Sequence, residues 1–305
     1  MSEAGWAESR AHMAAAMAAA WALLSAGGSA VDAVETMVMM MEDSPHFNAG
    51  HGAALTCEAT HELDASIMDG ATLSAGAVVG VTRVRNPVRA ARAVMESDVA
   101  VMLGGGAADA FAASQGLVMV APDYFTTQRR IEALASLKAR AASGALAKAS
   151  EAEKHGTVGA VARDASGHLA AATSTGGFNN KPVGRIGDSA IIGAGTYAAD
   201  GVCAVSCTGQ GEIFIRCVAA HELASRIRYA REDIEAASHD LVHTVLGGYG
   251  IGAGMIALGA TGDPVAPYNT LGMYRGWITT AGEMCVATHH ELHDLGPVAQ
   301  LQVSS

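Results

Sequence analysis

A glycine–threonine pair near the middle of the chain could carry covalent catalysis. Thr157 follows Gly156 at the end of a charged, alanine-rich stretch and opens an apolar run over residues 157–162. Glycine lets a peptide adopt strained conformations that other residues resist. The Thr157 hydroxyl could therefore attack the Gly156 carbonyl and convert the amide into an ester, which water would then hydrolyse.

Such a cleavage would place a nucleophile and a base in one residue. A free α-amino group has a pKa of about 7.7–8.0. The new amine of Thr157 would thus be a base near neutrality, beside the hydroxyl that it must activate. The alternative is that Thr157 is an ordinary strand residue, because β-branched side chains are common in strands.

The local patterns predict which elements hold this junction. Residues 128–156 alternate alanines with charges and show no sustained apolar face, which predicts an exposed, mobile connector. Residues 157–162 and 169–175 predict two strands joined by a turn at 164–167. Further strands are predicted at 190–192, 201–207 and 254–258, and helices at 8–25, from Ser29 onward, from Asn86-Pro87 onward and at 212–229. Helices first and strands later, with hairpins, predict an antiparallel-rich α+β fold.

Composition narrows the classes of function. The chain has 305 residues, a formal charge of −11 and no long basic run, which argues against nucleic acid as a partner. Five cysteines cannot all pair, which favours a reducing compartment. The apolar run at 13–24 is too short to span a bilayer and lacks a basic leader. We therefore expect a cytoplasmic protein with no membrane partner.

Several sequence blocks together resemble one enzyme family, the plant-type L-asparaginase/isoaspartyl peptidases. These are N-terminal nucleophile hydrolases with a threonine nucleophile. The resemblance covers roughly residues 11–277 in unbroken order. The blocks that carry it are MEDSPHFNAGHGAALTCEATHELDASIMDG, AGAVVGVTRVRNPVRAARAVME, HGTVGAVARDASGHLAAATSTGG, KPVGRIGDSAIIGAGTYA, AVSCTGQGE and PYNTLGMYRGW.

The resemblance implies a fold and an activity. The fold is a four-layer αββα sandwich formed by two autoproteolytic fragments, here residues 1–156 (with a linker at about 128–156) and 157–305, in a single domain. The activity is hydrolysis of β-aspartyl dipeptides and L-asparagine, with small-molecule substrates. The family's mature form is usually a dimer of cleaved pairs, so a homodimer is expected.

The resemblance also implies roles around the nucleophile. Thr175 would support Thr157, while the Thr208 hydroxyl and the Gly209 N–H would form the oxyanion hole, where losing one donor costs about 10²–10³ in rate. Asn48 would support the nucleophile, although it could equally be a turn residue.

A second set of implied roles concerns the substrate. Arg185 would grip its α-carboxylate, because a planar guanidinium matches two oxygens, and Asp188 would take its α-ammonium. Gly211 would help to hold that amine through its carbonyl. The alternative is a local Arg185–Asp188 surface pair, which would contribute little to stability.

No cofactor is expected for catalysis, but the resemblance implies a structural sodium site. Its ligands would be backbone carbonyls of one loop, namely those of Met41, Glu42, Ser44, Phe47, Ala49 and His51. A zinc site is a less favoured interpretation of the run from His289 to His293, because no third ligand is identifiable; a solvated segment is expected there.

Two alternative functions stay open at this point. A glycosylasparaginase is disfavoured because that branch typically has Asp before its threonine and a Gly-Asp-Gly-Asp motif, where this chain has Gly156 and TGQG. A non-catalytic family member is the other alternative. It is motivated by the lack of the family's first strand, which ends in a His-Gly-Gly-rich turn near the nucleophile.

Overall fold

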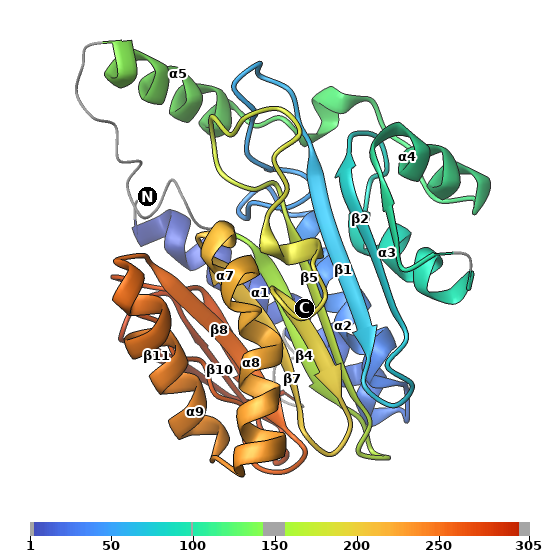
Figure 1. Ribbon diagram of the computed structural model, residues 1–305, viewed down its shortest axis with the longest axis vertical. Helices are drawn as coiled ribbons and strands as arrows, with labels where there is room; N and C mark the ends of the chain where they lie inside the picture. Colours follow the sequence, from blue (N-terminus) through green and yellow to red (C-terminus); the bar gives the residue numbers. More distant parts are fainter. Residues whose placement is uncertain (1–2, 99, 143–155, 299–305) are drawn as a thin grey trace.

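Packed β-sheets with helices on their outer faces form the frame of the protein in its computed structural model, which describes residues 3–98, 100–142 and 156–298 (Figure 1). The largest sheet has the order β3-β2-β1-β5-β4. Its neighbours are antiparallel except for β2 and β3, which run parallel. The strands are β1 (Leu63–Asp69), β2 (Ala75–Val81), β3 (Met102–Gly104), β4 (Val158–Arg163) and β5 (Leu169–Thr175).

Two three-stranded antiparallel sheets complete the β structure. One has the order β6-β7-β8 and packs its β6 and β7 against β5 of the largest sheet; the other has the order β11-β10-β9. Their strands are β6 (Thr196–Ala199), β7 (Cys203–Gly209), β8 (Ala253–Gly259), β9 (Arg275–Ile278), β10 (Glu283–Ala287) and β11 (Leu292–Pro297).

Helices lie on opposite sides of these sheets. Helices α2 and α3 pack on the largest sheet, and α1 packs on α2, β9 and β10. On the other side, α8 and α9 cover β6, β7 and β8 (Figure 1). The helices are α1 (Glu3–Ser25), α2 (Ala30–Glu42), α3 (Pro87–Glu96), α4 (Gly105–Ser114), α5 (Gln128–Ala142), α7 (Gly211–Cys217), α8 (Ala219–Ser225) and α9 (Ile234–Asp240).

Small residues let these layers approach closely. A Cβ added to Gly76 in β2 would lie 2.0 Å from the carbonyl oxygen of Ala91 in α3. A Cβ added to Gly159 in β4 would lie 1.9 Å from the Ser206 hydroxyl oxygen of β7. Any larger side chain at either position would force the layers apart, so these two glycines are required for packing.

Most of the predicted elements are confirmed, and three segments differ. The Ser29 side chain caps α2 by accepting from the Asp32 N–H at 3.1 Å, and β5 has the predicted bounds. The predicted helix 212–229 is broken at Val218, whose φ of +49° lies in the left-handed region. Residues 188–190 form the 3-10 helix η2 (Asp188–Ala190), where a strand was predicted over 190–192, because the Ile191 N–H donates to the Asp188 carbonyl at 2.8 Å and closes a turn.

The third difference concerns the predicted connector at 128–156. Residues 128–142 form helix α5, which extends from the body of the molecule (Figure 1). One face of it is buried through Arg130, Leu134 and Leu137. The apolar pattern was too weak to predict a packed helix because one of these three buried positions is an arginine. The remainder of the predicted connector, 143–155, lies outside the described residues.

No helix in the described ranges is both long and apolar enough to cross a membrane.

Candidate active site

Thr157 lies directly before β4, at the end of the strand pair that carries Thr175. Val158 pairs with Ser174, so the two threonines face each other across adjacent strands. The Thr157 hydroxyl donates to the Thr175 hydroxyl oxygen at 3.1 Å. The Gly177 N–H also donates to that oxygen, at 3.0 Å, which fixes the Thr175 rotamer. The strand register thus brings together two of the predicted residues.

The peptide before Thr157 is held by Asn48. The Asn48 N–H donates to the Gly156 carbonyl oxygen at 2.9 Å, which polarises the bond that Thr157 would attack. A Cβ at position 156 would lie 2.5 Å from the Asn48 Cβ, so only glycine fits there. Glycine is therefore required by close packing as well as by conformational freedom.

Asn48 is also a structural anchor for the surrounding loops. Its side chain is buried, accepts from the Ala54 N–H at 2.6 Å and donates to the Gly177 carbonyl. Its own carbonyl accepts from the Gly176 N–H at 2.8 Å. The supporting role and the turn role predicted for Asn48 are thus compatible, because backbone and side chain act on different partners.

Thr208 and Gly209 lie at the end of β7, opposite Gly254 and Ala253 of β8. Thr208 lines the same cavity as Thr157. A Cβ on Gly209 would lie 2.5 Å from the Phe214 ring, so glycine is needed for the strand to pass α7. The structure therefore places Thr208 on the cavity that Thr157 also lines, with Gly209 next to it at the end of β7.

Arg185, Asp188 and Gly211 form a second group beside Thr175. A Cβ on Gly211 would lie 2.8 Å from Asp188 Oδ1 and 3.0 Å from Arg185 Nη2. A Cβ on Gly177 would lie 3.4 Å from Arg185 Nη1, and the Gly177 N–H bonds Thr175. The guanidinium edge that carries both Nη atoms thus faces a glycine-lined space close to Thr175.

Asp188 is a buried carboxylate with one unused oxygen. Its Oδ2 is buried and has no hydrogen-bond partner among the described residues. Burial raises the pKa of Asp188 from 3.8 to about 7, and Arg185 opposes that rise. Oδ1 is the oxygen on the Gly211 side, and a positively charged ligand group there would favour the ionised form of the carboxyl.

The Arg185–Asp188 surface pair considered as an alternative is not formed. In the described part of the chain, Arg185 pairs with Glu212, its Nε donating to Oε1 at 3.0 Å. The guanidinium also lies over the Phe178 ring, 4.8 Å from its centroid. Glu212 and Phe178 were not predicted as site residues. Glu212 directly follows Gly211 in the TGQGE block. Its position next to a predicted site residue was the only sequence feature that could have indicated a role in the site.

A buried layer supports the loop that carries Arg185. Lys181 is fully buried and donates from Nζ to the Glu62 carbonyl at 2.6 Å. Asp64 accepts from the Gly187 N–H at 3.3 Å and from the Gly80 N–H at 2.9 Å. Burial lowers the pKa of Lys181, and its nearby opposite charge, Asp64, offsets that effect. These contacts hold both ends of the segment that contains Arg185.

The predicted sodium loop connects α2 to Asn48. Two of its six carbonyls already accept N–H groups, Met41 from Ser44 at 3.2 Å and Glu42 from His51 at 2.7 Å. A carbonyl oxygen has two lone pairs, so these bonds leave room for a cation. Burial raises the pKa of the Glu42 side chain to about 8. The geometry is compatible with a cation site.

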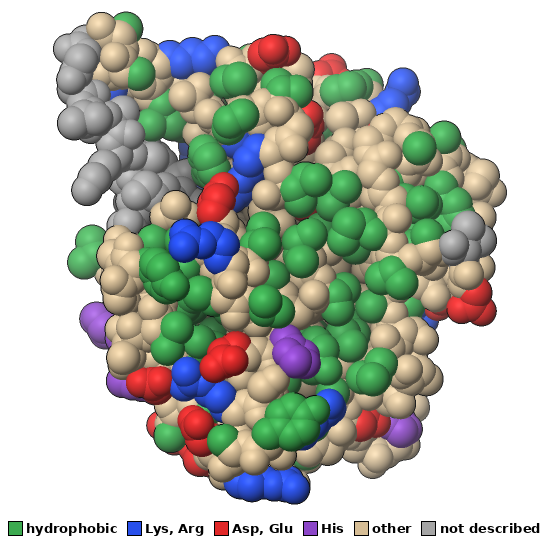
Figure 2. Space-filling view, viewed as in Figure 1, with side chains coloured by type: hydrophobic (Ala, Val, Ile, Leu, Met, Phe, Trp, Pro, Cys, Tyr) green, Lys and Arg blue, Asp and Glu red, His purple; other side chains and the backbone are tan. Residues whose placement is uncertain are grey.

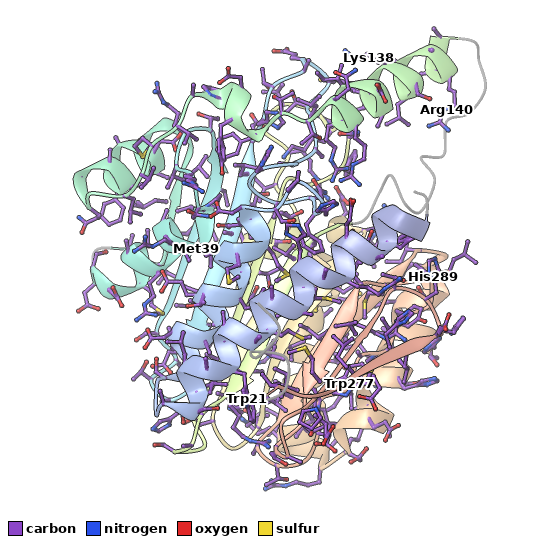
Figure 3. All side chains as sticks on the ribbon, turned by 180° about the vertical axis from the view of Figure 1, so that it is seen from behind. Trp21, Met39, Lys138, Arg140, Trp277 and His289 are labelled. Carbon is purple, nitrogen blue, oxygen red and sulfur yellow. The ribbon has the colours of Figure 1, made fainter. Side chains whose placement is uncertain are left out.

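The histidines of the C-terminal run point to different neighbours. His289 packs edge-on against Trp6 with centroids 4.8 Å apart, beside the start of α1 (Figure 3). His290 stacks on Tyr268, and His293 lies in strand β11, not in a helix. Among the described residues, no group of three or more His, Cys, Asp or Glu side chains could hold a metal ion.

Comparisons with known proteins agree with the pattern of sequence blocks. The family model described as asparaginase matches residues 1–287. An isoaspartyl peptidase of Salmonella typhimurium is 50% identical over 262 residues, 84% of this chain and 82% of the relative. An isoaspartyl peptidase of Escherichia coli is 48% identical over 260 residues, 84% and 80% of the two chains. A probable isoaspartyl peptidase/L-asparaginase 2 of Arabidopsis thaliana is 40% identical over 281 residues, 85% of each.

Proposed function

The chain belongs to the asparaginase family, and on this premise we propose that it hydrolyses β-aspartyl dipeptides and L-asparagine to release L-aspartate. We further propose that Thr157 is the nucleophile, after cleavage of the bond that precedes it. One observation carries this mechanism. The Thr157 hydroxyl lies 3.1 Å from that of Thr175, beside a Gly156 carbonyl that accepts from the Asn48 N–H at 2.9 Å.

Processing begins at the Gly156–Thr157 peptide. The Thr157 oxygen adds to the Gly156 carbonyl carbon while its proton passes to the peptide nitrogen. The C–N bond then breaks and an ester remains. The Asn48 N–H stabilises the charge that develops on the carbonyl oxygen. Water hydrolyses the ester and leaves a carboxylate on Gly156 and a free amine on Thr157.

Turnover uses the two groups of Thr157 together. The α-amine takes the proton of the side-chain hydroxyl, and the oxygen attacks the amide carbonyl of the substrate. The Thr208 hydroxyl and the Gly209 N–H stabilise the oxyanion. The leaving amine departs with a proton, and water hydrolyses the acyl ester to release aspartate. Thr175 keeps the Thr157 hydroxyl oriented throughout.

Recognition of the aspartyl group rests on Arg185 and Asp188. The two Nη atoms of Arg185 face the glycine-lined space and match the two oxygens of an α-carboxylate. Asp188 Oδ1, the oxygen on the side of Gly211 and Arg185, would accept from the α-ammonium, with the Gly211 carbonyl beside it. Arg185 requires an α-carboxylate and Asp188 requires an α-ammonium on the same end of the substrate. A substrate that lacks either group should therefore bind poorly.

The assembly proposed here has two levels. Fragments 1–156 and 157–305 would remain together as one four-layer αββα sandwich, and two such pairs would form a dimer. Apolar side chains gather on the face in Figure 2. Val183, Ile186 and Val218 are exposed on the loop and helices near the recognition group. Burying such side chains is what a stable subunit interface requires.

A sodium ion on the loop from Met41 to His51 is proposed as a structural element only. Its carbonyl ligands would stiffen the loop that ends at Asn48 and so hold the Gly156 carbonyl in place. Replacing sodium with a bulky organic cation in the buffer should lower the midpoint of thermal unfolding. A sodium-independent midpoint would remove this part of the proposal.

The central experiment is intact-mass and N-terminal sequencing of the purified protein, with aspartate release measured on both substrates. We expect two fragments that meet at Thr157, and activity in the cleaved material. Thr157→Ala should remain full length and inactive, whereas Thr157→Ser should retain slower cleavage and some activity. Activity in a preparation that is wholly uncleaved would refute the mechanism. Complete cleavage without turnover on either substrate would refute the proposed substrates.

A further inference from the structure

A cavity beside Thr157 has an unusual charge for this protein. It measures about 400 Å³ and reaches from Thr157 and Thr208 to Arg129 and Arg130 of α5. Of the described residues that line it, none is an aspartate or a glutamate. The chain as a whole carries a formal charge of −11, so this excess of positive charge in one cavity is a local feature.

Arg130 is a buried cation for which the described residues provide no counter-ion. It is 6% exposed, and its guanidinium makes one hydrogen bond in the described part of the chain, from Nε to the Gly52 carbonyl at 2.6 Å. Burial first, and then the positive charge of Arg129, lowers the pKa of Arg130 to about 9, so it stays charged at neutral pH. A buried charge of this kind is costly unless it is paired.

Arg129 lies at the mouth of the same cavity. Its Nη2 atom donates to the carbonyls of His46 at 3.2 Å and of Pro45 at 3.4 Å. No carboxylate within ion-pair distance of either arginine occurs among residues 3–98, 100–142 and 156–298. Carbonyl partners orient the two guanidinium groups but do not neutralise them. The remaining donors of both side chains are thus available to an anion.

The position of the cavity identifies which part of a substrate would enter it. Arg185, Asp188 and Gly211 lie on the Gly177 side of Thr157 and do not line the cavity. The aspartyl end of a substrate must therefore extend from Thr157 toward Arg185. The amide nitrogen is the other substituent of the attacked carbon, so the leaving group must extend away from Arg185, into the cavity.

We propose that Arg129 and Arg130 form a subsite for the carboxylate of the leaving amino acid of a β-aspartyl dipeptide. This inference rests on the proposed function. Asparagine loses only ammonia and has no group to place there, whereas every unmodified β-aspartyl dipeptide carries a carboxylate next to its scissile amide. The subsite would favour dipeptides with a free C-terminus over asparagine.

A matched pair of substrates tests the subsite directly. The cleaved enzyme is assayed with β-aspartyl-leucine and with its C-terminal amide, which differ only in the charge that the arginines would bind. L-asparagine serves as the substrate without a leaving residue. Hydrogen bonds between charged groups contribute enough that we expect kcat/KM for the free acid to exceed that for the amide by about tenfold or more.

Three variants complete the test. Arg130→Gln should abolish most of this acid-to-amide ratio by raising KM for the acid, and Arg129→Gln should reduce it about threefold because its exposed charge is screened. Neither should change kcat/KM for asparagine by more than about twofold. Arg83→Gln removes the same charge from an exposed arginine outside the cavity and should keep the wild-type ratio. If Arg130→Gln fails to fold, Arg129→Gln decides.

The remaining outcomes overturn the inference in distinguishable ways. A wild-type ratio near one, or a ratio unchanged in both arginine variants, refutes the subsite while asparagine hydrolysis preserves the proposed function. Slower cleavage before Thr157 with an unchanged ratio would mean that the arginines bind the new Gly156 carboxylate instead, which also refutes it. A cleaved wild-type enzyme that releases no aspartate from any of the three substrates refutes both proposals.

Discussion

Two arginine sites flank Thr157, and they differ in what surrounds the guanidinium. Arg185 has a carboxylate at 3.0 Å, an aromatic ring beneath it and a buried Lys181–Asp64 layer behind its loop. Arg130 has a single carbonyl at 2.6 Å and a second arginine as its charged neighbour. The Nη atoms of Arg185 lie close to Gly177 and Gly211, whereas Arg130 lines the cavity beside Thr157.

The difference teaches how each site can discriminate. A guanidinium held by a counter-ion and a ring is fixed in orientation, so it can demand one geometry from its ligand. A guanidinium without a counter-ion is held less strictly but gains more from any anion that arrives. We therefore expect Arg185 to be required for every substrate and Arg130 to matter only for substrates with a charged leaving group.

The largest expected effect comes from removing the fixed arginine. Arg185→Gln loses two charge-assisted hydrogen bonds to the α-carboxylate, so kcat/KM should fall about 100-fold or more for asparagine and for β-aspartyl dipeptides alike. Arg185→Lys keeps the positive charge but cannot donate two parallel hydrogen bonds to the carboxylate, so it should recover only part of the lost kcat/KM. Steady-state kinetics on both substrates measures this. A fall in kcat/KM for dipeptides alone would contradict this expectation, because it would mean that Arg185, rather than Arg130, binds the leaving group.

The next largest effect is the pH dependence of aspartate binding, which should depend on Asp188 in the Arg185 site. Burial raises the pKa of Asp188 to about 7. Between pH 8 and 6 the ionised fraction falls about tenfold, so binding of L-aspartate to the cleaved enzyme should weaken by about that factor. Calorimetric titration at several pH values measures it. Asp188→Asn should bind weakly with little dependence on pH, and a parallel dependence in that variant would assign the titration elsewhere.

The same pKa has a consequence of opposite sign for stability. The folded state retains the Asp188 proton between about pH 4 and 7, where an unfolded chain has already released it. Stability contributed by this group is therefore greatest below about pH 4 and declines as the pH rises to 7. Ligand affinity and unliganded stability should change in opposite directions over this range, which is typical of a carboxylate placed for function.

The nucleophile side of the site could be predicted from the sequence largely because it depends on local order. Thr157 and Thr175 lie at matching ends of two adjacent strands, which were predicted from two apolar runs and the turn between them. Their contact across the strand pair is then a matter of register. The order of elements also predicted an α+β fold with antiparallel strands.

The cavity side could not be predicted, because its residues meet only through tertiary packing. Arg129 and Arg130 belong to a segment whose many charges predicted an exposed connector. Arg130 is buried because its side chain contacts residues that are distant in sequence, such as Gly52. Glu212 and Phe178 raise the same difficulty on the other side. Both residues contact Arg185, from which Glu212 is 27 positions away and Phe178 is 7 positions away. Neither separation is a sequence spacing that predicts a contact.

A smaller effect is expected from the counter-ion that distinguishes Arg185. Glu212→Ala removes the bond to Nε and should raise KM for both substrates by about fivefold or less, because this carboxylate is half-exposed and screened. Glu212→Gln can still accept from Nε and should be closer to wild type. The effect of Glu212→Ala should shrink at high salt. Equal defects in both variants would mean that charge, rather than orientation, is what Glu212 supplies.

The smallest effect tests the ring beneath Arg185, which has no counterpart at Arg130 in the described part of the chain. Phe178→Leu keeps an apolar side chain but removes the quadrupole that attracts the guanidinium, an interaction of about 0.5–1 kcal/mol near a surface. KM should therefore rise about two- to fivefold for asparagine and for the dipeptide, with kcat nearly unchanged, because the ring stacks on the binding group. Phe178→Tyr retains the π face and serves as the control. A fall in kcat instead would indicate that the ring positions the adjoining Gly177, whose N–H holds Thr175, and would extend its influence from the recognition group to the nucleophile.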